Sequence, residues 1–253
     1  MIIILRIVRL RETEKRITGR RLEFTDNLKL DLERRDFTIN AMAYNDKRGL
    51  IDEFEGIKDL KDGIIRCVGD AGQRFDEDAL RMLRAVRFAG QLGFAIEEKT
   101  REAIVERADH LKNISAERIR VELTKLLVSK EAGRIRDAYK TGMTKYFLPE
   151  LDAAMQTEQK NPHHIYTVGE HSICGIELMN CFFGITSDKK IYDKIPENVL
   201  ETAKQLAAKM DKKQQTVLCM TMLLHDIAKP AVMTVDEKGI GHFIGHPVQS
   251  EKM

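Results

Sequence analysis

The chain lacks the features that mark secreted and membrane proteins. Its four cysteines form no Cys-x-x-Cys pair and no dense framework, a pattern that favours a reducing compartment over secretion. No apolar stretch approaches the roughly 18 residues that span a bilayer, and residues 1–8 are too few for a signal peptide with its cleavage site. We therefore expect a cytoplasmic protein without membrane association.

A large excess of charge of one sign is also missing. The 42 lysines and arginines are nearly balanced by 40 aspartates and glutamates, which leaves a formal net charge of +2. Any RNA-binding surface must therefore be a local patch. The 253 residues suffice for one large or two modest domains with a sizeable core, and no internal repeat is evident.

Two segments about forty positions apart carry the most information. Residues 34–43 read Arg-Arg-Asp-Phe-Thr-Ile-Asn-Ala-Met-Ala, and residues 77–88 read Glu-Asp-Ala-Leu-Arg-Met-Leu-Arg-Ala-Val-Arg-Phe. At about 100° per helical residue, Arg81, Arg84 and Arg87 fall on one arc while apolar residues fill the opposite side. The second segment therefore predicts a helix with one packed face and one cationic face.

Asp78 lies one turn before Arg81, at the edge of this cationic arc. A guanidinium donates in a planar fork and a carboxylate only accepts, so the pair can match a base that offers both donors and acceptors. Arg84 and Arg87 would then be free to bind phosphate oxygens. The alternative is an i,i+3 salt bridge between Asp78 and Arg81, with solvated arginines and acidic residues that complement a helix N-terminus.

Both segments resemble the second and fourth motifs of the CCA-adding tRNA nucleotidyltransferases and bacterial poly(A) polymerases. The similarity to the class II bacterial enzymes extends over about residues 22–150, including residues 50–52 through 67–69 and Glu117-Arg118-Ile119-Arg120-Val121-Glu122-Leu123. It implies the addition of C and A to tRNA 3′ ends from CTP and ATP with Mg2+. The nucleotide is then selected by protein side chains.

The same resemblance implies a role for six residues. The residue matching Arg35 contacts the incoming nucleotide, the one matching Asp36 lies at the ribose, and Asp78 with Arg81 templates C or A. Further nucleotide contacts are implied for Arg84 and Arg87.

The chain also departs from the family pattern. Where the family usually reads Asp-Pro-Phe-Gly-Gly, residues 52–56 read Asp-Glu-Phe-Glu-Gly. Nothing like the family's Gly-Gly-x-x-Arg turn and metal-binding Asp-x-Asp pair precedes Arg34, where Glu12 and Glu14 are acids at that spacing without an upstream glycine turn. We therefore assign no catalytic residue and expect a chain that binds nucleotides without transferring them.

A second constellation follows residue 150, where six of the seven histidines lie. Histidine and aspartate bind divalent cations, and the apolar run Val217 to Leu224 predicts a buried support for His225-Asp226. Residues 161–171 and 223–230 resemble the HD phosphohydrolase fold, which is attached to some CCA-adding enzymes. This resemblance implies that His171, His225 and Asp226 bind a metal, while the fold's later aspartate has no match before Met253.

For two other histidines of this region, His242 and His246, a substrate or second-metal role and a solvated or core position stay open. The head lacks its metal carboxylates and the HD-type part lacks its last ligand, so we expect a chain truncated at both ends.

The residue pattern places these features in a mostly α-helical chain with a small residual β-sheet. Strands are predicted within Leu22 to Asn45 and at Ile64 to Val68, and helices from Asp76 onward, at 96–111, from Ser115 and over Lys130 to Phe147. We expect a partial nucleotidyltransferase head with a remnant of a polymerase-β-like palm (1–69), a helical neck that binds RNA and nucleotide (70–150) and a partial, all-α HD-type domain (151–253).

Three functions follow as hypotheses. The leading one is a tRNA nucleotidyltransferase with tRNA, ATP and CTP as partners, Mg2+ as the cofactor of the transferase, and a second divalent metal in the HD-type domain. The alternatives are a non-catalytic RNA- or nucleotide-binding fragment and an HD-type metal-dependent phosphohydrolase.

Overall fold

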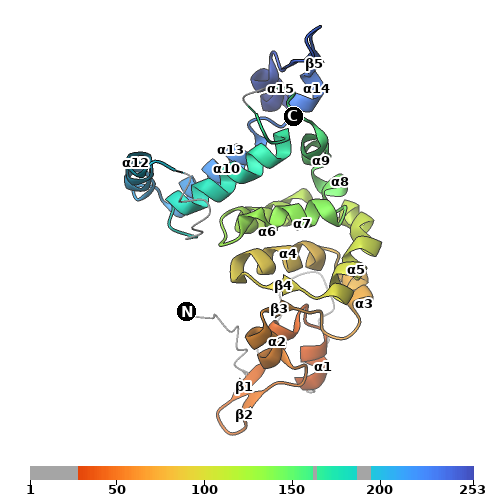
Figure 1. The fold of residues 1–253 in the computed structure, drawn as a ribbon. Helices are drawn as coiled ribbons and strands as arrows, with labels where there is room; N and C mark the ends of the chain where they lie inside the picture. Colours follow the sequence, from red (N-terminus) through yellow and green to blue (C-terminus); the bar gives the residue numbers. More distant parts are fainter. Residues whose placement is uncertain (1–27, 162–163, 187–194) are drawn as a thin grey trace.

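The computed structural model describes residues 28–161, 164–186 and 195–253, so Glu12 and Glu14 lie outside the described residues. Figure 1 shows a stacked arrangement that runs from the β1–β2 hairpin at one end to β5, α14 and α15 at the other. Helices predominate and each sheet has two strands, which confirms the mostly helical fold with little sheet. No helix among the described residues is both long enough and apolar enough to cross a membrane.

The first part combines short helices with two small sheets. Strands β1 (Ala43–Asn45) and β2 (Gly49–Ile51) pair antiparallel, whereas β3 (Ile64–Ile65) and β4 (Ala95–Ile96) pair in parallel. The remaining elements are α1 (Leu28–Glu33), the 3-10 helix η1 (Thr38–Asn40) and α2 (Gly56–Asp62). The predicted strand between Gly63 and Gly69 is therefore present but shorter, and most of the described part of the predicted strand Leu22 to Asn45 is helix or turn.

The next part is a set of packed helices. Its α-helices are α3 (Ala71–Glu77), α4 (Leu80–Leu92), α5 (Glu98–Arg107), α6 (Ala116–Leu127), α7 (Ile135–Lys140), α8 (Thr144–Phe147) and α9 (Pro149–Gln156), with 3-10 helices η2 (Ala108–Asn113) and η3 (Ala132–Arg134). Helix α4 packs against α6, and Gly90 permits close contact because a Cβ there would lie 2.7 Å from a methyl of Leu126. This α4–α6 pair supports the first cluster described below.

Three predicted helices are interrupted, and the one at 96–111 is divided into α5 and η2. The predicted helix from Lys130 to Phe147 is divided into η3, α7 and α8, and Gly142 adopts a φ of 77° between α7 and α8. That left-handed backbone suits glycine and ends a helix. The helix predicted from Asp76 is divided as well, because Asp78 caps the end of α3 with extended backbone and α4 begins at Leu80.

The last part contains α10 (Val168–Phe182), α12 (Glu197–Ala207), α13 (Lys212–Leu224), α14 (Lys229–Val232) and α15 (His246–Lys252). An antiparallel pair, β5 (Thr234–Val235) with β6 (Gly241–His242), shows that the expectation of an all-α region was wrong in detail. The run Val217 to Leu224 forms helix, but only Cys219 and Leu223 in it are buried. Apolar composition alone did not separate the core side of α13 from its exposed side, where Val217 lies.

Polar contacts join this last part to the preceding helices. Arg136 of α7 donates to Glu170 and Glu177 of α10, with Nε to Glu170 Oε2 at 2.9 Å and Nη1 to Glu177 Oε1 at 2.7 Å. The buried Asn180 side chain also donates to the carbonyl of Leu127 at 2.8 Å. Helix α10 is therefore anchored on α6 and α7 by side chains as well as by core packing.

Candidate functional site

Asp36 links the 34–43 segment to helix α4. Its carboxylate is buried, and one oxygen, Oδ2, accepts from Arg84 Nε at 2.8 Å and from Arg84 Nη2 at 2.5 Å. The other oxygen accepts from the Phe37 backbone at 2.9 Å and from Asn40 Nδ2 at 3.1 Å. These four donors fix the carboxylate in one orientation and leave Arg84 partly exposed beside it.

Asp78 and Arg81 lie near each other in the chain but do not pair in the structure. Asp78 Oδ2 accepts from Arg118 Nη2 of α6 at 2.7 Å, and its Oδ1 accepts from the backbone of Leu80 at 3.2 Å. The i,i+3 salt bridge between Asp78 and Arg81, the alternative that the spacing left open, is therefore absent. The break between α3 and α4 turns the Asp78 carboxylate toward α6 instead.

Arg81 is held by a separate set of acceptors. Its Nη1 donates to Glu77 Oε2 at 2.6 Å and to the carbonyl of Arg74 at 3.0 Å, while Nη2 donates to the carbonyl of Arg34 at 2.8 Å. The last contact joins helix α4 to the 34–43 segment, which lies 47 positions earlier in the sequence. The two segments singled out by the sequence therefore form one cluster.

Arg87 lies on the same side of α4 as Arg84 but is buried. Its Nε pairs with Glu122 Oε2 of α6, its Nη1 donates to Gln91 Oε1 at 2.7 Å, and the guanidinium stacks 3.8 Å from the centre of the Phe88 ring. Burial lowers the pKa of Arg87, and the charge of Glu122 opposes this effect. The guanidinium is thus committed to contacts within the protein, and its partner Glu122 also lies 3.8 Å from Arg84.

Arg35 completes the predicted nucleotide-binding set. Its Nη1 donates to the carbonyl of Asn40 at 2.9 Å, and its Nη2 lies 3.4 Å from Asp31 in α1. A separate cavity of about 550 Å³, lined partly by Thr38, Cys67 and Thr100, includes none of the six predicted nucleotide-binding residues. The candidate site is therefore the side-chain cluster, which lies outside that cavity.

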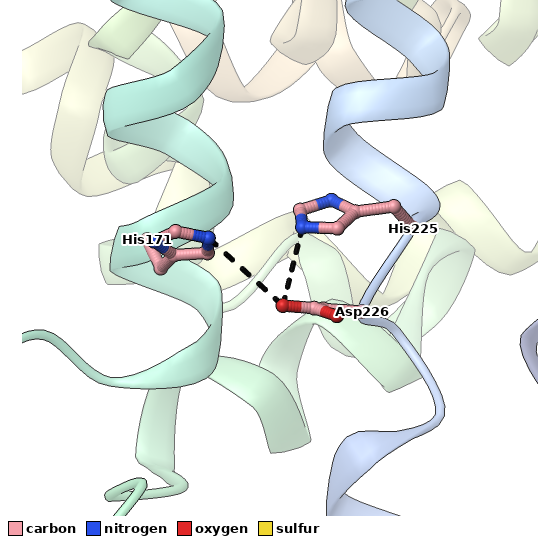
Figure 2. Close-up of side chains that lie close together, drawn as sticks. All are labelled: His171, His225 and Asp226. Atoms are coloured by element: carbon pink, nitrogen blue, oxygen red, sulfur yellow. Dashed lines mark ion pairs between the residues drawn. The ribbon is translucent and has the colours of Figure 1, made fainter. Parts of the chain in front are cut away.

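The second cluster brings together the three predicted metal ligands. His171 comes from α10, and His225 and Asp226 follow the end of α13, as Figure 2 shows. One atom from each residue can be chosen so that all three lie within 4.8 Å of one another. His225 Nε2 lies 3.1 Å and His171 Nε2 lies 4.0 Å from Asp226 Oδ2.

Neighbouring groups orient this second cluster. The Nδ1 atom of His225 lies 2.9 Å from the carbonyl of Met222, which favours a proton on Nδ1 and leaves Nε2 available to a metal. Burial lowers the pKa of His171, which favours the neutral ring that metals require. Hydrogen bonding to Asp226 raises the pKa of His225, so its proton must leave when a metal binds.

Two further side chains contact Asp226. Lys229 Nζ lies 2.8 Å from Oδ2, and His246 Nε2 lies 3.2 Å from Oδ1. Lys229 also donates to Gln159 Oε1 at 2.9 Å in a buried position. Hydrogen bonds from His225 and Lys229 outweigh the effect of burial and hold the pKa of Asp226 well below its usual range, so this carboxylate is ionised at neutral pH.

The donor sets of the two clusters suit different ligands. Within the described residues, only His171, His225 and Asp226 form a group with metal-ligand geometry. The acids of the first cluster, Asp36 and Asp78, are occupied by Arg84 and Arg118 and lack that geometry. The first cluster therefore fits an organic anion such as a nucleotide. Its described residues do not form a set of ligands for Mg2+.

Sequence reasoning missed some of the supporting residues. Arg118 and Glu122 belong to the 117–123 segment that resembles the family, and their i,i+4 spacing on a helix indicates a shared face, but the sequence alone suggested no role for them. Arg118 holds Asp78, and Glu122 holds Arg87 and lies 3.8 Å from Arg84. For His246 the sequence indicated two alternative roles, and for Lys229 it indicated none. Their approach to Asp226 depends on the fold, which brings α14 and α15 together.

Comparison with known proteins gives two family matches. Residues 4–66 match a family model described as the poly A polymerase head domain, and residues 93–155 match one described as a probable RNA and SrmB-binding site of polymerase A. The first match includes Arg35 and Asp36, and the second includes Arg118 and Glu122. Both matched regions thus contribute residues to the first cluster.

Curated relatives match about half of the chain or less. The CCA-adding enzyme of Lactobacillus delbrueckii subsp. bulgaricus is 50% identical over 126 residues, which are 49% of this chain and 32% of that enzyme. The CCA-adding enzyme of Lactiplantibacillus plantarum is 56% identical over 105 residues, 42% of this chain and 26% of the enzyme. The aligned part is thus about a third or less of each relative's length.

A solved structure extends the comparison. The CCA-adding enzyme of Bacillus stearothermophilus in complex with CTP is 28% identical, with a TM-score of 0.50, over 82% of this chain and 55% of that one. A structure described as a tRNA-processing enzyme in an apo form is 26% identical, with a TM-score of 0.55, over 79% of this chain and 49% of that one. Residues 4–66 are thus similar to a nucleotidyltransferase-type head, and the helices of residues 93–155 are similar to a region described as a probable RNA-binding site. Parts of the chain are similar in sequence to poly A polymerases and CCA-adding enzymes, and its fold is similar to that of a CCA-adding enzyme.

Proposed function

We propose that this chain supplies nucleotide selection and RNA binding for the addition of C and A to tRNA 3′ ends, with CTP and ATP as donors. The observation that carries the proposal is the meeting of the 34–43 segment with α4, through Arg81 to the Arg34 carbonyl and Arg84 to Asp36. This contact brings the guanidinium groups of Arg81 and Arg84 into one cluster with two oriented carboxylates, those of Asp36 and Asp78. The CTP complex of the B. stearothermophilus relative supports the choice of nucleotide class.

In this proposal the two ends of the cluster bind different parts of the nucleotide, the base and the triphosphate. Asp78 and Arg81 present a fixed acceptor and a fixed donor group, which can read the edge of a base as a complementary pattern. Arg84 and Arg35 retain partly exposed guanidinium groups for triphosphate oxygens. Arg87 stays within the predicted set, in our proposal as support for Arg84.

In nucleotidyl transfer the RNA 3′-hydroxyl attacks the α-phosphorus and pyrophosphate leaves, a step that bound Mg2+ assists. The residues proposed here bind and orient the nucleotide for that step. We further propose a cytoplasmic setting and the three-part division of the chain near residues 69 and 150.

For the last part we propose a divalent-metal site of the HD type formed by His171, His225 and Asp226. The comparisons favour nucleotidyl transfer over phosphoester hydrolysis as the function of the chain. We therefore treat the metal site as a separate feature.

The test is equilibrium binding of the four nucleoside triphosphates to the chain and to Arg81→Ala. We expect CTP and ATP to bind more tightly than UTP and GTP, and Arg81→Ala to lose about 1–3 kcal/mol of that preference. Arg101→Ala, an exposed arginine on α5, is the matched control. Equal affinity for all four nucleotides in the parent chain would exclude base selection by this cluster.

A further inference from the structure

An apolar groove with a cationic and aromatic rim lies between η2, α6 and the α8 region, apart from both clusters. It encloses about 280 Å³. Its floor and walls are formed by apolar side chains: Leu111, Ile114, Ile119, Leu123, Phe147 and Leu148. Lys112, Arg120 and Tyr146 line the same groove.

The rim residues are available for a ligand. Tyr146 is 42% exposed, and within the described residues its hydroxyl makes no hydrogen bond. Arg120 is exposed, and its guanidinium forms no ion pair with any part of the chain that the structure describes. Lys112 is also exposed and lies 3.2 Å from Asp109 in a solvent-facing pair. Such an exposed pair holds its cation only weakly.

This combination matches the chemistry of an RNA strand better than that of a free small molecule. Unpaired bases stack on aromatic side chains, their faces bury against apolar surface, and adjacent phosphates bind cations. The volume lies at the lower limit of about 300 Å³ for small-ligand pockets, so it suits one planar group and not a whole nucleotide. The charge of the rim complements a polyanion.

Helix α6 contributes residues both to the groove and to the first cluster, which we call the nucleotide cluster because we propose that it binds the nucleotide. Arg118 faces the cluster and holds Asp78, while Arg120 lies two residues later on the groove side. At about 1.5 Å of rise per residue, the two arginines differ by only about 3 Å along the helix axis. At about 100° per residue they point to different sides of α6, so an RNA whose 3′ end is at the cluster has to extend around this helix to reach the groove.

We propose that this groove, here called the Tyr146 groove, binds an unpaired base of the RNA substrate, with Arg120 at a neighbouring phosphate. The proposal rests on the proposed function, because it needs an RNA that reaches the nucleotide cluster. The match of residues 93–155 to a family region described as a probable RNA-binding site supports this assignment.

The test measures binding of a tRNA transcript that lacks its 3′ CCA, at several salt concentrations, to the full chain and its variants. We expect Tyr146→Ala to weaken binding on the order of tenfold with an unchanged salt slope, because it removes stacking and not charge. Tyr146→Phe should retain the parent affinity. Arg120→Ala should weaken binding and reduce the salt slope by about one.

Matched controls separate the groove from general effects. Tyr44→Ala removes a similarly exposed ring in β1, and Lys213→Ala removes an exposed cation in α13, and we expect neither to change affinity by more than about twofold. CTP affinity, measured in parallel, should stay at the parent value in every variant and thereby report on the fold.

Three results would overturn the groove proposal. Tyr146→Ala that binds tRNA like the parent would overturn the groove proposal and favour a protein occupant, while nucleotide selection could still hold. A parent chain that binds CTP and ATP selectively but no tRNA would overturn both the groove proposal and the RNA-binding part of the proposed function. A loss of tRNA affinity that is equal in Tyr146→Phe and Tyr146→Ala would also exclude stacking on this ring.

Discussion

At the scale of single residues, the first cluster is organised by arginines that orient carboxylates. Arg84 donates twice to Asp36, and Arg118 donates to Asp78 from the neighbouring helix. A carboxylate held in this way presents its remaining lone pairs in a fixed direction, so a base that binds there need not order it first. Selectivity is therefore expected to depend on Arg118 even without direct contact to the nucleotide.

We expect Arg118→Ala to reduce the preference for CTP and ATP over UTP and GTP by about 1 kcal/mol, toward the lower limit for a base contact. The Asp78 carboxylate would lose its 2.7 Å partner and rotate more freely. Arg118→Lys should restore part of the preference, because a cation is retained without the planar fork. The measurement is the set of four dissociation constants, with Arg101→Ala as control, and an unchanged ratio in Arg118→Ala would refute the positioning role.

Buried thiols give a second prediction at this scale. Burial raises the pKa of both Cys67 and Cys219 to about 12. An unfolded thiol ionises near about 8.5, so these groups contribute stability that is fully present below that pH and declines as the pH rises toward 12.

We therefore expect the free energy of unfolding to fall between pH 8.5 and pH 12, and the fall to be smaller in the double variant Cys67→Ala and Cys219→Ala. At pH 8, a thiol reagent should modify the half-buried Cys174 first and reach Cys67 only on unfolding. Urea titration at each pH measures the first expectation, and labelling followed by mass spectrometry measures the second. Rapid labelling of Cys67 in the folded protein would contradict the burial argument.

At the scale of elements, α4 and α6 form the support of the nucleotide cluster. Glu122 of α6 is buried and lies against Arg87, with Arg84 3.8 Å away. Removing one member of a buried ion pair leaves the other charge without compensation, which costs more than the pair itself contributes. The α4–α6 contact should therefore be sensitive to Glu122 in a way that exposed acids of the same helix are not.

We expect Glu122→Gln to destabilise the protein by about 3 kcal/mol or more, because Arg87 would remain buried and charged. The double variant Arg87→Met with Glu122→Leu should recover most of this loss. Exposed Glu117 lies on the same helix, and Glu117→Gln should change stability by less than about 0.5 kcal/mol. Denaturant unfolding measures all three variants, and a near-neutral Glu122→Gln would show that the buried pair does not stabilise the α4–α6 contact.

The elements also show what the sequence could and could not predict. Apolar periodicity correctly predicted α4 with its three arginines on one side, because a helix repeats its faces independently of the rest of the chain. It missed the break at Asp78 and the burial of Arg87, because both depend on contacts with α6, about 40 residues later in the sequence. The pairing of Asp78 with Arg118 is of the same kind, since spacing within one helix cannot reveal a partner on another.

At the scale of the whole molecule, the nucleotide cluster and the metal-type cluster are built from different elements. The first uses the 34–43 segment, α4 and α6, and the second uses α10 and the end of α13. The elements are connected through α7, which packs against α4 and whose Arg136 pairs with Glu170 and Glu177 of α10. This common framework keeps both clusters in one folded unit, but it gives neither cluster a ligand from the other.

We therefore expect the two clusters to bind their ligands independently. Mn2+ at about 100 times its dissociation constant should stabilise the folded chain by roughly 2.7 kcal/mol, and His171→Ala should remove this stabilisation. CTP affinity should be the same in His171→Ala as in the parent, because no residue of the nucleotide cluster contacts His171. The matched control is His242→Ala, whose exposed ring pairs with Asp236 at 2.9 Å and lies outside the ligand group.

Thermal unfolding with Mn2+ or with a chelator measures the first effect, and titration with CTP measures the second. Equal stabilisation of His171→Ala and the parent would mean that His171 is not a ligand, and weaker CTP binding in His171→Ala would mean that the clusters are coupled through α10 and Arg136.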